Sequence, residues 1–325
     1  MKYRKLGKTG LKISELSLGA WLTYGGSLEQ DQSKPCITKA IELGVNFIDI
    51  ADIYAKGKAE EVVGNILIEE NYNRKDLVIS SKVFWPMSES PNDRGLSRKH
   101  IMESIEGTLD RLQTDYVDIY FCHRFDRETP LEETVKAMSD LVDQGLVHYW
   151  GTSVWTAAKL ERAVGIAKAN GYHPPSVEQP RYNMFDRYIE LEVMETTSHH
   201  GLGIVVWSPL SGGLLTGKYN TTIPEGSRAA STQFLKPFIT PENIQKITQL
   251  QTVANELNLT IGQLALAWIL RRPEISSAIT GATKVDHVES NMQASGIALN
   301  NDTLNKIEEI LANKPEMHPV YRPPW

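Results

Sequence analysis

The chain has 325 residues, of which 41% are hydrophobic and 23% are charged, and its formal net charge is −6 at pH 7. This composition is typical of a globular protein and too apolar for a disordered chain. The length allows either two domains of average size or one large barrel. The acidic balance, with no run of basic residues, argues against a nucleic-acid partner.

Targeting and metal signals are missing from the sequence. The basic residues near the start are not followed by the apolar stretch of a signal peptide. The longest apolar stretch, near residues 264–270, is far shorter than the roughly 20 residues that span a membrane. Cys36 and Cys122 are too few for a disulfide framework, and the adjacent His199 and His200 diverge on a helix. We therefore predict a cytoplasmic protein with no membrane insertion and no metal site.

Eight short runs rich in Val, Ile and Phe recur along the chain, and each is predicted to be a buried strand. The starts of the first seven lie roughly 30 residues apart, which is the length of one strand–helix–strand step. The last interval is longer. The runs span residues 16–18, 45–48, 77–80, 117–121, 148–150, 176–178, 204–206 and 277–279.

Segments with helical periodicity separate these strands. Ser97 and the pair Thr129-Pro130 are typical of the first turn of two of the helices. No long linker divides the series, so we predict a single domain over residues 1–325. The predicted helices span residues 34–43, 59–67, 98–112, 131–142, 157–169, 189–198, 241–257, 261–270 and 302–311.

Alternating strands and helices predict an α/β fold with a parallel sheet, and eight such units close into a (β/α)8 TIM barrel. A doubly wound open sheet is the alternative, but its first strand should lead into a Gly-x-Gly-x-x-Gly turn, which does not follow Gly19. Residues from about 1 to 14 have the pattern of a β-hairpin that can plug one end of the barrel. An insertion over about 208–240 precedes the eighth strand, and the Pro-rich tail over about 314–325 is predicted to be a loop.

The polar residues that follow each strand should converge at the mouth of such a barrel. Asp49, Tyr54, Lys82 and His123 are four of them. A neighbouring ammonium lowers the pKa of a tyrosine, so Lys82 can make Tyr54 a better acid. Asp49 can hold Lys82, and His123 can donate a hydrogen bond to a substrate oxygen. This set suits protonation of a carbonyl oxygen as hydride arrives at the carbon, and a nicotinamide cofactor must supply the hydride.

These four residues and the stretches around them resemble those of the aldo-keto reductases, and the resemblance covers nearly the whole chain. The family's tetrad matches the four residues above, within the stretches 46–54, 79–82 and 120–123. Within the family the chain is most similar to the group of the cytoplasmic beta subunits of voltage-gated potassium channels. Those subunits carry Asn at the position of His123, so the resemblance implies that this chain is a working reductase. The stretches shared with that group are 55–60, 94–100, 149–153 and 207–210.

The resemblance also implies NADP(H) as the cofactor. It implies that Ser153 and Gln179 hold the nicotinamide carboxamide and that Trp207 stacks on the ring. Arg228 and the stretch 283–291 would hold the 2′-phosphate. The pyrophosphate would be lined by Ser208, Leu210, Gly213 and Lys218. The insertion over about 208–240 would then cover the cofactor. The full implied set is Gly19, Trp21, Asp49, Ser153, Gln179, Trp207, Ser208, Pro209, Leu210, Gly213, Lys218, Arg228, Gly281, Thr283, His287 and Asn291.

Some positions depart from the family pattern. Val154 stands where many relatives have Asn, and His287 stands where Arg or Gln is common. Lys284 and Arg228 can still join His287 in neutralising a 2′-phosphate, so we predict NADPH over NADH.

Three functional hypotheses remain open at this point. The first is an NADPH-dependent reductase that converts small aldehydes or ketones into alcohols. The second, implied by the potassium-channel resemblance, is a slow-turnover NADPH-binding regulatory or redox-sensing subunit, which would form a tetramer. The third is a Schiff-base aldolase that uses Lys82. Aromatic residues predicted to line the substrate cleft are Trp21, Trp85, Trp155, Tyr321 and Trp325.

Overall fold

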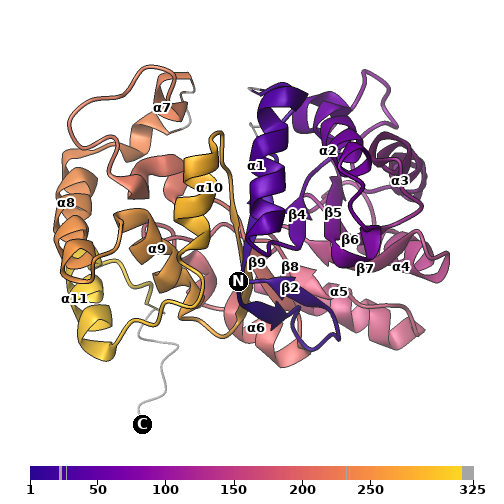
Figure 1. Cartoon of the computed structure of the whole chain (residues 1–325). Helices are drawn as coiled ribbons and strands as arrows, with labels where there is room; N and C mark the ends of the chain where they lie inside the picture. Colours follow the sequence, from indigo (N-terminus) through magenta and orange to yellow (C-terminus); the bar gives the residue numbers. More distant parts are fainter. Residues whose placement is uncertain (22–23, 27, 232, 234, 317–325) are drawn as a thin grey trace, which may run out of the picture.

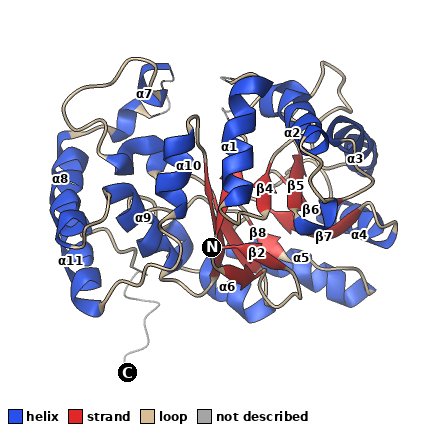
Figure 2. Ribbon diagram, viewed as in Figure 1, coloured by secondary structure: helices blue, strands red, loops and turns tan. Residues whose placement is uncertain are grey.

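Eight parallel strands close into a barrel in the order β10-β3-β4-β5-β6-β7-β8-β9. This computed structural model describes residues 1–21, 24–26, 28–231, 233 and 235–316. Every predicted strand is present, so the prediction of a (β/α)8 barrel is confirmed, and Figure 2 shows the strands enclosed between helices. The strands are β3 (Leu16–Gly19), β4 (Phe47–Asp49), β5 (Val78–Val83), β6 (Val117–Cys122), β7 (Val147–Thr152), β8 (Val177–Glu178), β9 (Gly203–Val206) and β10 (Ile275–Thr280).

Helices follow the strands along the chain and pack around them (Figure 1). In the described part of the chain no single helix is long and apolar enough to cross a membrane; α8 and α9 pass that test only as a pair bent by 86°. The helices are α1 (Gln30–Glu42), α2 (Lys58–Glu69), α3 (Arg98–Leu112), α4 (Leu131–Asp143), α5 (Ala157–Asn170), α6 (Val193–His200), α7 (Arg228–Ser231), α8 (Pro241–Glu256), α9 (Ile261–Leu270), α10 (Val285–Met292) and α11 (Asn301–Leu311).

Short 3-10 segments account for most differences from the predicted elements. The predicted helix over 189–198 is divided into a 3-10 turn, η3, and α6. Helix α10 was missed because it has only two turns, and its buried apolar residues are limited to Val288 and Met292. The 3-10 segments are η1 (Tyr54–Gly57), η2 (Arg74–Asp76), η3 (Tyr188–Glu190), η4 (Ser211–Thr216) and η5 (Lys236–Phe238).

The two predicted helix starts differ in their capping. Ser97 caps α3, since its hydroxyl accepts a hydrogen bond from the backbone N–H of His100 at 3.3 Å. Thr129 does not cap α4; its hydroxyl donates to Asp126 at 2.8 Å, and Pro130 is the residue that precedes the helix.

The N-terminal hairpin closes one end of the barrel. Its strands β1 (Tyr3–Lys5) and β2 (Lys12–Ser14) are antiparallel, and Leu6 and Ile13 are fully buried. These two side chains share a cluster with the residues that fill the barrel interior. Gly7 has a φ of +57° and lies so close to the neighbouring chain that an added Cβ would be 2.3 Å from the carbonyl oxygen of Gly201, so only glycine fits. The interior residues of that cluster are Phe47, Val78, Ile119, Phe121, Val177, Val205 and Ile279.

The position of the hairpin identifies the opposite, open end. The backbone N–H of Lys8 donates to Gly201, just before β9, and that of Gly7 lies 3.4 Å from Ser276 Oγ, near the start of β10. The hairpin therefore plugs the end at which the strands begin, as predicted, and the functional mouth lies where they end. At the other terminus, residues 312–316 have no regular structure, and the rest of the predicted tail lies outside the described residues.

Candidate active site

Four side chains predicted from strand ends come together at the open mouth. Lys82 Nζ donates hydrogen bonds to Asp49 Oδ2 at 2.8 Å and to the phenolic oxygen of Tyr54 at 3.2 Å. The centroids of the Tyr54 and His123 rings are 5.8 Å apart, with the rings edge to face. The structure therefore unites the predicted tetrad, with the buried Lys82 at its centre.

Parallel strand pairing positions Asp49 and Lys82. Asp49 is the last residue of β4 and lies opposite Ser80 of β5, whose hydroxyl donates to Asp49 Oδ1 at 2.7 Å. Gln179 Nε2 donates to the same oxygen at 2.8 Å. With Lys82, three donors surround this buried carboxylate, which compensates for its removal from water.

The turn that carries Tyr54 is conformationally strained. Ala55 and Lys56 both have left-handed backbones, with φ of 50° and 52°. Non-glycine residues in this region cost about 1 kcal/mol or more each, so surrounding contacts must maintain the turn. Asp52 provides two of them, because its carboxylate accepts hydrogen bonds from the backbone N–H of Ile53 at 2.6 Å and from Ser104 of α3 at 3.1 Å.

Burial controls the protonation state of the tetrad. It raises the pKa of Tyr54 above its ordinary value, and the opposing effect of Lys82 is smaller. Burial opposes the charge on Lys82, but Asp49 and Tyr54 outweigh it, so the pKa of Lys82 is raised. Burial, followed by the charges of Lys82 and Arg124, holds the pKa of His123 well below its usual range. Lys82 thus lowers the pKa of Tyr54, as predicted, but burial outweighs this effect. Near neutral pH the site holds a protonated phenol, an ammonium and a neutral imidazole.

The carboxyl of Asp52 leads to a prediction about stability. Burial and the neighbouring Glu60 raise the pKa of Asp52 from 3.8 to about 8. A carboxyl with a raised pKa binds more protons in the folded than in the unfolded state, so the free energy of unfolding should fall as pH rises through this interval. Asp52→Asn does not titrate; its amide oxygen can still accept from the backbone N–H of Ile53, and its amide N–H can donate to Ser104 Oγ. We expect it to raise Tm more at pH 9 than at pH 6.

Thermal unfolding at the two pH values checks this expectation. The buried carboxyls of Glu60 and Glu178 also have raised pKa values, so Asp52→Asn should make the decline with pH shallower without abolishing it. Asp110→Asn, at an exposed position of α3, is the matched control and should not change the profile. An equal change in Tm at both pH values for Asp52→Asn would contradict the prediction.

The residues implied for the nicotinamide end lie next to the tetrad. Ser153 Oγ donates to the backbone oxygen of Gln179 at 2.8 Å, while the side chain of Gln179 reaches Asp49. The Trp21 and Trp207 rings meet edge to face with centroids 6.2 Å apart. At the end of β3, Gly19 is required by packing, because an added Cβ would lie 2.6 Å from a methyl group of Ile279.

The loop after β9 forms a tight backbone turn. Ser208 has a positive φ of 54°, and it is followed by the buried Pro209 and the half-buried Leu210. In η4, Gly213 has a φ of 97°, and an added Cβ would lie 2.9 Å from the ammonium of Lys218. The loop therefore forms a cradle in which glycine allows a lysine ammonium to approach the backbone.

Basic groups gather between this loop and α10. Partial burial and the positive charges of Lys218 and Lys284 lower the pKa of His287, and the carboxyl of Asp286 opposes them. His287 therefore lies within electrostatic range of both lysines and of Asp286. Gly281 and Thr283 are exposed between β10 and α10, and Asn291 is buried one turn beyond His287.

Arg228, which the resemblance implies for the 2′-phosphate together with the stretch 283–291, lies close to Trp21 and to the η4 loop. Its guanidinium lies 5.4 Å from the centroid of the Trp21 ring. Its Cδ is 3.7 Å from the position of a Cβ on Gly212. A cation–π contact thus brings Arg228 to the Trp21 side of the mouth.

The predicted aromatic walls are only partly correct. Trp21 and Trp85 are 36% and 38% exposed, as residues of a cleft should be. Trp155 is 1% exposed and packs edge to face against Phe125, so it belongs to the core. Tyr321 and Trp325 lie outside the described residues.

Two polar residues at the mouth received no role in the sequence analysis. Glu178, at the end of β8, is fully buried and accepts hydrogen bonds from Thr152 Oγ1 and from the backbone N–H of Trp155, the latter at 3.1 Å. Arg124 directly follows His123. The strand-end rule that identified the tetrad is also the signal that could have identified both.

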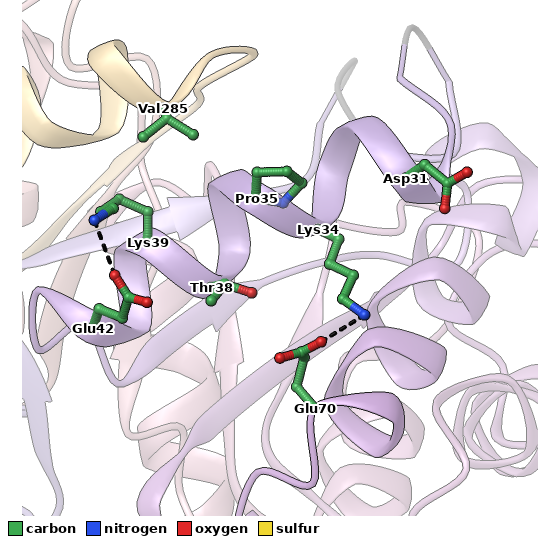
Figure 3. Close-up of a pocket in the computed structure, with 8 residues that line it drawn as sticks. All are labelled: Asp31, Lys34, Pro35, Thr38, Lys39, Glu42, Glu70 and Val285. Atoms are coloured by element: carbon green, nitrogen blue, oxygen red, sulfur yellow. Dashed lines mark ion pairs between the residues drawn. The ribbon is translucent and has the colours of Figure 1, made fainter.

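A separate open pocket of about 410 Å³ lies outside the barrel, between α1 and the start of α10 (Figure 3). Lys34 pairs with Glu70 at 2.5 Å and Lys39 with Glu42 at 2.9 Å, so its lysines are already neutralised. No residue of the tetrad lines it. The lining residues are Asp31, Lys34, Pro35, Thr38, Lys39, Glu42, Glu70 and Val285.

Comparison with known proteins gives one family. The model of the Aldo/keto reductase family matches residues 15–312. A protein of Arabidopsis thaliana named "Probable voltage-gated potassium channel subunit beta" is 44% identical over 329 residues, covering 99% of this chain and 100% of the relative. A protein of the same name from Oryza sativa subsp. japonica is 42% identical, with the same coverage.

Proposed function

Because this chain belongs to the aldo/keto reductase family, we propose that it is an NADP(H)-dependent oxidoreductase that reduces the carbonyl group of an aldehyde or ketone to an alcohol. Members of this family are typically NAD(P)-dependent carbonyl reductases. The observation that carries the proposal is the buried Asp49–Lys82–Tyr54 contact, in which an ammonium with a carboxylate partner lies 3.2 Å from a phenolic oxygen.

Proton transfer is the step that these residues would perform. A reduced nicotinamide bound at the mouth would supply hydride to the carbonyl carbon. Tyr54 would donate its phenolic proton to the carbonyl oxygen, so that the carbonyl gains one hydride and one proton. Lys82 would stabilise the phenolate left on Tyr54, and Asp49 would keep Lys82 in place. The neutral His123 would donate a hydrogen bond that orients the substrate oxygen.

The residues at the mouth fit a phosphorylated dinucleotide. Trp207 with Ser153 and Gln179 would hold the nicotinamide, and the cradle of Gly213 and Lys218 would hold the pyrophosphate. Val154 supplies no side-chain amide here. Lys218, Lys284 and His287 form no ion pair with a carboxylate in the described ranges, so a 2′-phosphate would be their natural counter-ion. We propose that residues 208–240 cover the cofactor, in one domain over 1–325.

Cofactor titration tests this proposal. We expect NADPH to quench tryptophan fluorescence and to bind about tenfold or more tightly than NADH, since one charge-assisted contact contributes about 1.4 kcal/mol or more. Lys284→Gln should weaken the binding of NADPH but not that of NADH. The control Lys75→Gln, at an exposed site elsewhere, should change neither affinity. Equal affinity for the two cofactors would contradict the role of Lys284, and failure to bind either would contradict the proposed function.

The names of the two relatives favour a second candidate, a regulatory or redox-sensing subunit that binds NADPH and turns over slowly. Stopped-flow mixing of the NADPH complex with an aldehyde distinguishes the two. A fast first turnover followed by a slow steady state supports the subunit, because cofactor exchange then limits the rate, whereas a fast steady state supports a metabolic reductase. The potassium-channel resemblance is also our ground for proposing a cytoplasmic tetramer, which light scattering can test.

A Schiff-base aldolase is the least favoured of the three functional hypotheses. Its lysine must lose a proton before it attacks a carbonyl. Lys82 has a raised pKa and donates to Asp49, to Tyr54 and to the backbone oxygen of Ile50 at 2.5 Å. An ammonium with three acceptors is a poor nucleophile.

A further inference from the structure

A half-buried guanidinium lies beside the tetrad. Arg124 Nη1 donates to the backbone oxygen of His123 and lies 3.3 Å from Ser153 Oγ. Its Nε and Nη2 have no hydrogen-bond partner, and no carboxylate lies within ion-pair distance, among residues 1–21, 24–26, 28–231, 233 and 235–316. Nε and Nη2 form the edge of a guanidinium that binds a carboxylate through two parallel hydrogen bonds.

A continuous series of side chains connects the guanidinium of Arg124 to the proton donor. The guanidinium of Arg124 lies 5.8 Å from the centroid of the Trp85 ring, and Trp85 lies 6.2 Å from the His123 ring. The His123 ring in turn lies 5.8 Å from that of Tyr54. Trp85 is 38% exposed, so it offers an apolar surface between the two polar ends. A substrate that lies across Trp85 can present one end to Tyr54 and the other to Arg124.

The charge of Arg124 is poorly compensated within the protein. Burial lowers its pKa, and the acidic groups that act on it are Tyr54, Glu178 and Tyr188. Glu178 is the only carboxyl of the three, and its own pKa is raised by burial to about 7. Desolvating a guanidinium without a bound anion is unfavourable, so a carboxylate brought by a ligand would gain a strong partner here.

We propose that Arg124 is the specificity-determining residue of the site, and that the substrates are aldehydes that carry a carboxylate at the end away from the carbonyl group. This inference rests on the proposed reductase function. It adds the class of substrate and the residue that selects it, since Tyr54 would act on the aldehyde while Arg124 binds the carboxylate.

A matched pair of substrates tests the inference in the NADPH-loaded protein. 4-Carboxybenzaldehyde and methyl 4-formylbenzoate have the same aldehyde but differ in charge. We expect kcat/KM to be about tenfold or more higher for the acid. Arg124→Met should lower kcat/KM for the acid about 10- to 100-fold, chiefly by raising KM. It should change kcat/KM for the ester by less than about threefold. Arg124→Lys should be intermediate because it keeps the charge but loses the planar edge.

Binding provides a second readout that does not depend on turnover. Calorimetric titration of the NADP⁺ complex with 4-(hydroxymethyl)benzoate should detect binding to the wild type and to Arg127→Met, an exposed arginine three residues away, but not to Arg124→Met. If Arg124→Met changes both substrates equally, or still binds the acid, Arg124 only supports the Ser153 loop and the inference is overturned. If neither aldehyde is reduced, the proposed function fails, and the calorimetric comparison then decides the role of Arg124 by itself.

Discussion

Tyr54→Phe is expected to lower kcat for aldehyde reduction by about 10²- to 10⁴-fold, which is the usual contribution of a general acid. The phenolic oxygen accepts a hydrogen bond from Lys82 at 3.2 Å, and burial keeps the phenol protonated near neutral pH. Removing only the hydroxyl preserves the ring that packs edge to face with His123. NADPH affinity and folding should therefore stay close to those of the wild type.

Steady-state kinetics with a reactive aldehyde, together with an NADPH titration of the same protein, measures this effect. Tyr116→Phe is a suitable control, because Tyr116 stacks with Arg74 and His148 outside the tetrad. A Tyr54→Phe variant with near-wild-type kcat would exclude Tyr54 as the acid.

Of the substitutions proposed for this protein, Lys82→Met should destabilise the fold most, lowering the free energy of unfolding by about 3–5 kcal/mol. Lys82 is fully buried and is the ion-pair partner of Asp49, which is 3% exposed. After the substitution Asp49 keeps its hydrogen bonds from Ser80 and Gln179 but loses its counter-ion. Activity should be lost as well, because the ammonium that donates a hydrogen bond to the phenolic oxygen of Tyr54 would be gone.

A double variant separates the two consequences. The double variant Asp49→Asn/Lys82→Met has no uncompensated charge. We therefore expect its free energy of unfolding, measured in urea, to return close to the wild-type value, while the protein stays inactive. Lys99→Met removes an exposed lysine that pairs with Glu103 along α3, and it should cost less than about 1 kcal/mol. If the single and double variants are equally unstable, Lys82 contributes through packing and not through the charge of Asp49.

Local sequence patterns were sufficient for the barrel and for the gathering of the tetrad. Each strand is a short apolar run, which can be recognised from residues that are neighbours along the chain. Once eight strand–helix units are recognised, closure into a parallel barrel brings their ends to one mouth. Asp49, Lys82 and His123 could therefore be placed together although they are far apart along the chain. The helix over 189–198 was less well predicted, because its apolar residues are shared between η3 and α6.

The electrostatic state of the site could not be obtained in the same way. The sequence indicated that Lys82 would lower the pKa of Tyr54, and Lys82 has this effect in the structure. The net shift in the Tyr54 pKa also depends on how completely other elements exclude water from the phenol. Likewise, Trp155 was predicted to line the cleft and is buried against Phe125. Burial is a sum over the whole packed molecule, so no single motif contains it.

Sequence patterns were thus enough to predict the fold, the family and the four residues at the mouth. Which charged side chains have a partner of opposite charge could be seen only in the folded protein. Tertiary structure placed Arg228 beside Trp21, brought His287 near Lys218 and Lys284, and left one edge of Arg124 without a hydrogen-bond partner in the described part of the protein. The physical reason is that strand formation depends on neighbours along the chain, whereas the partner of a charge depends on distances in space that only the closed barrel establishes.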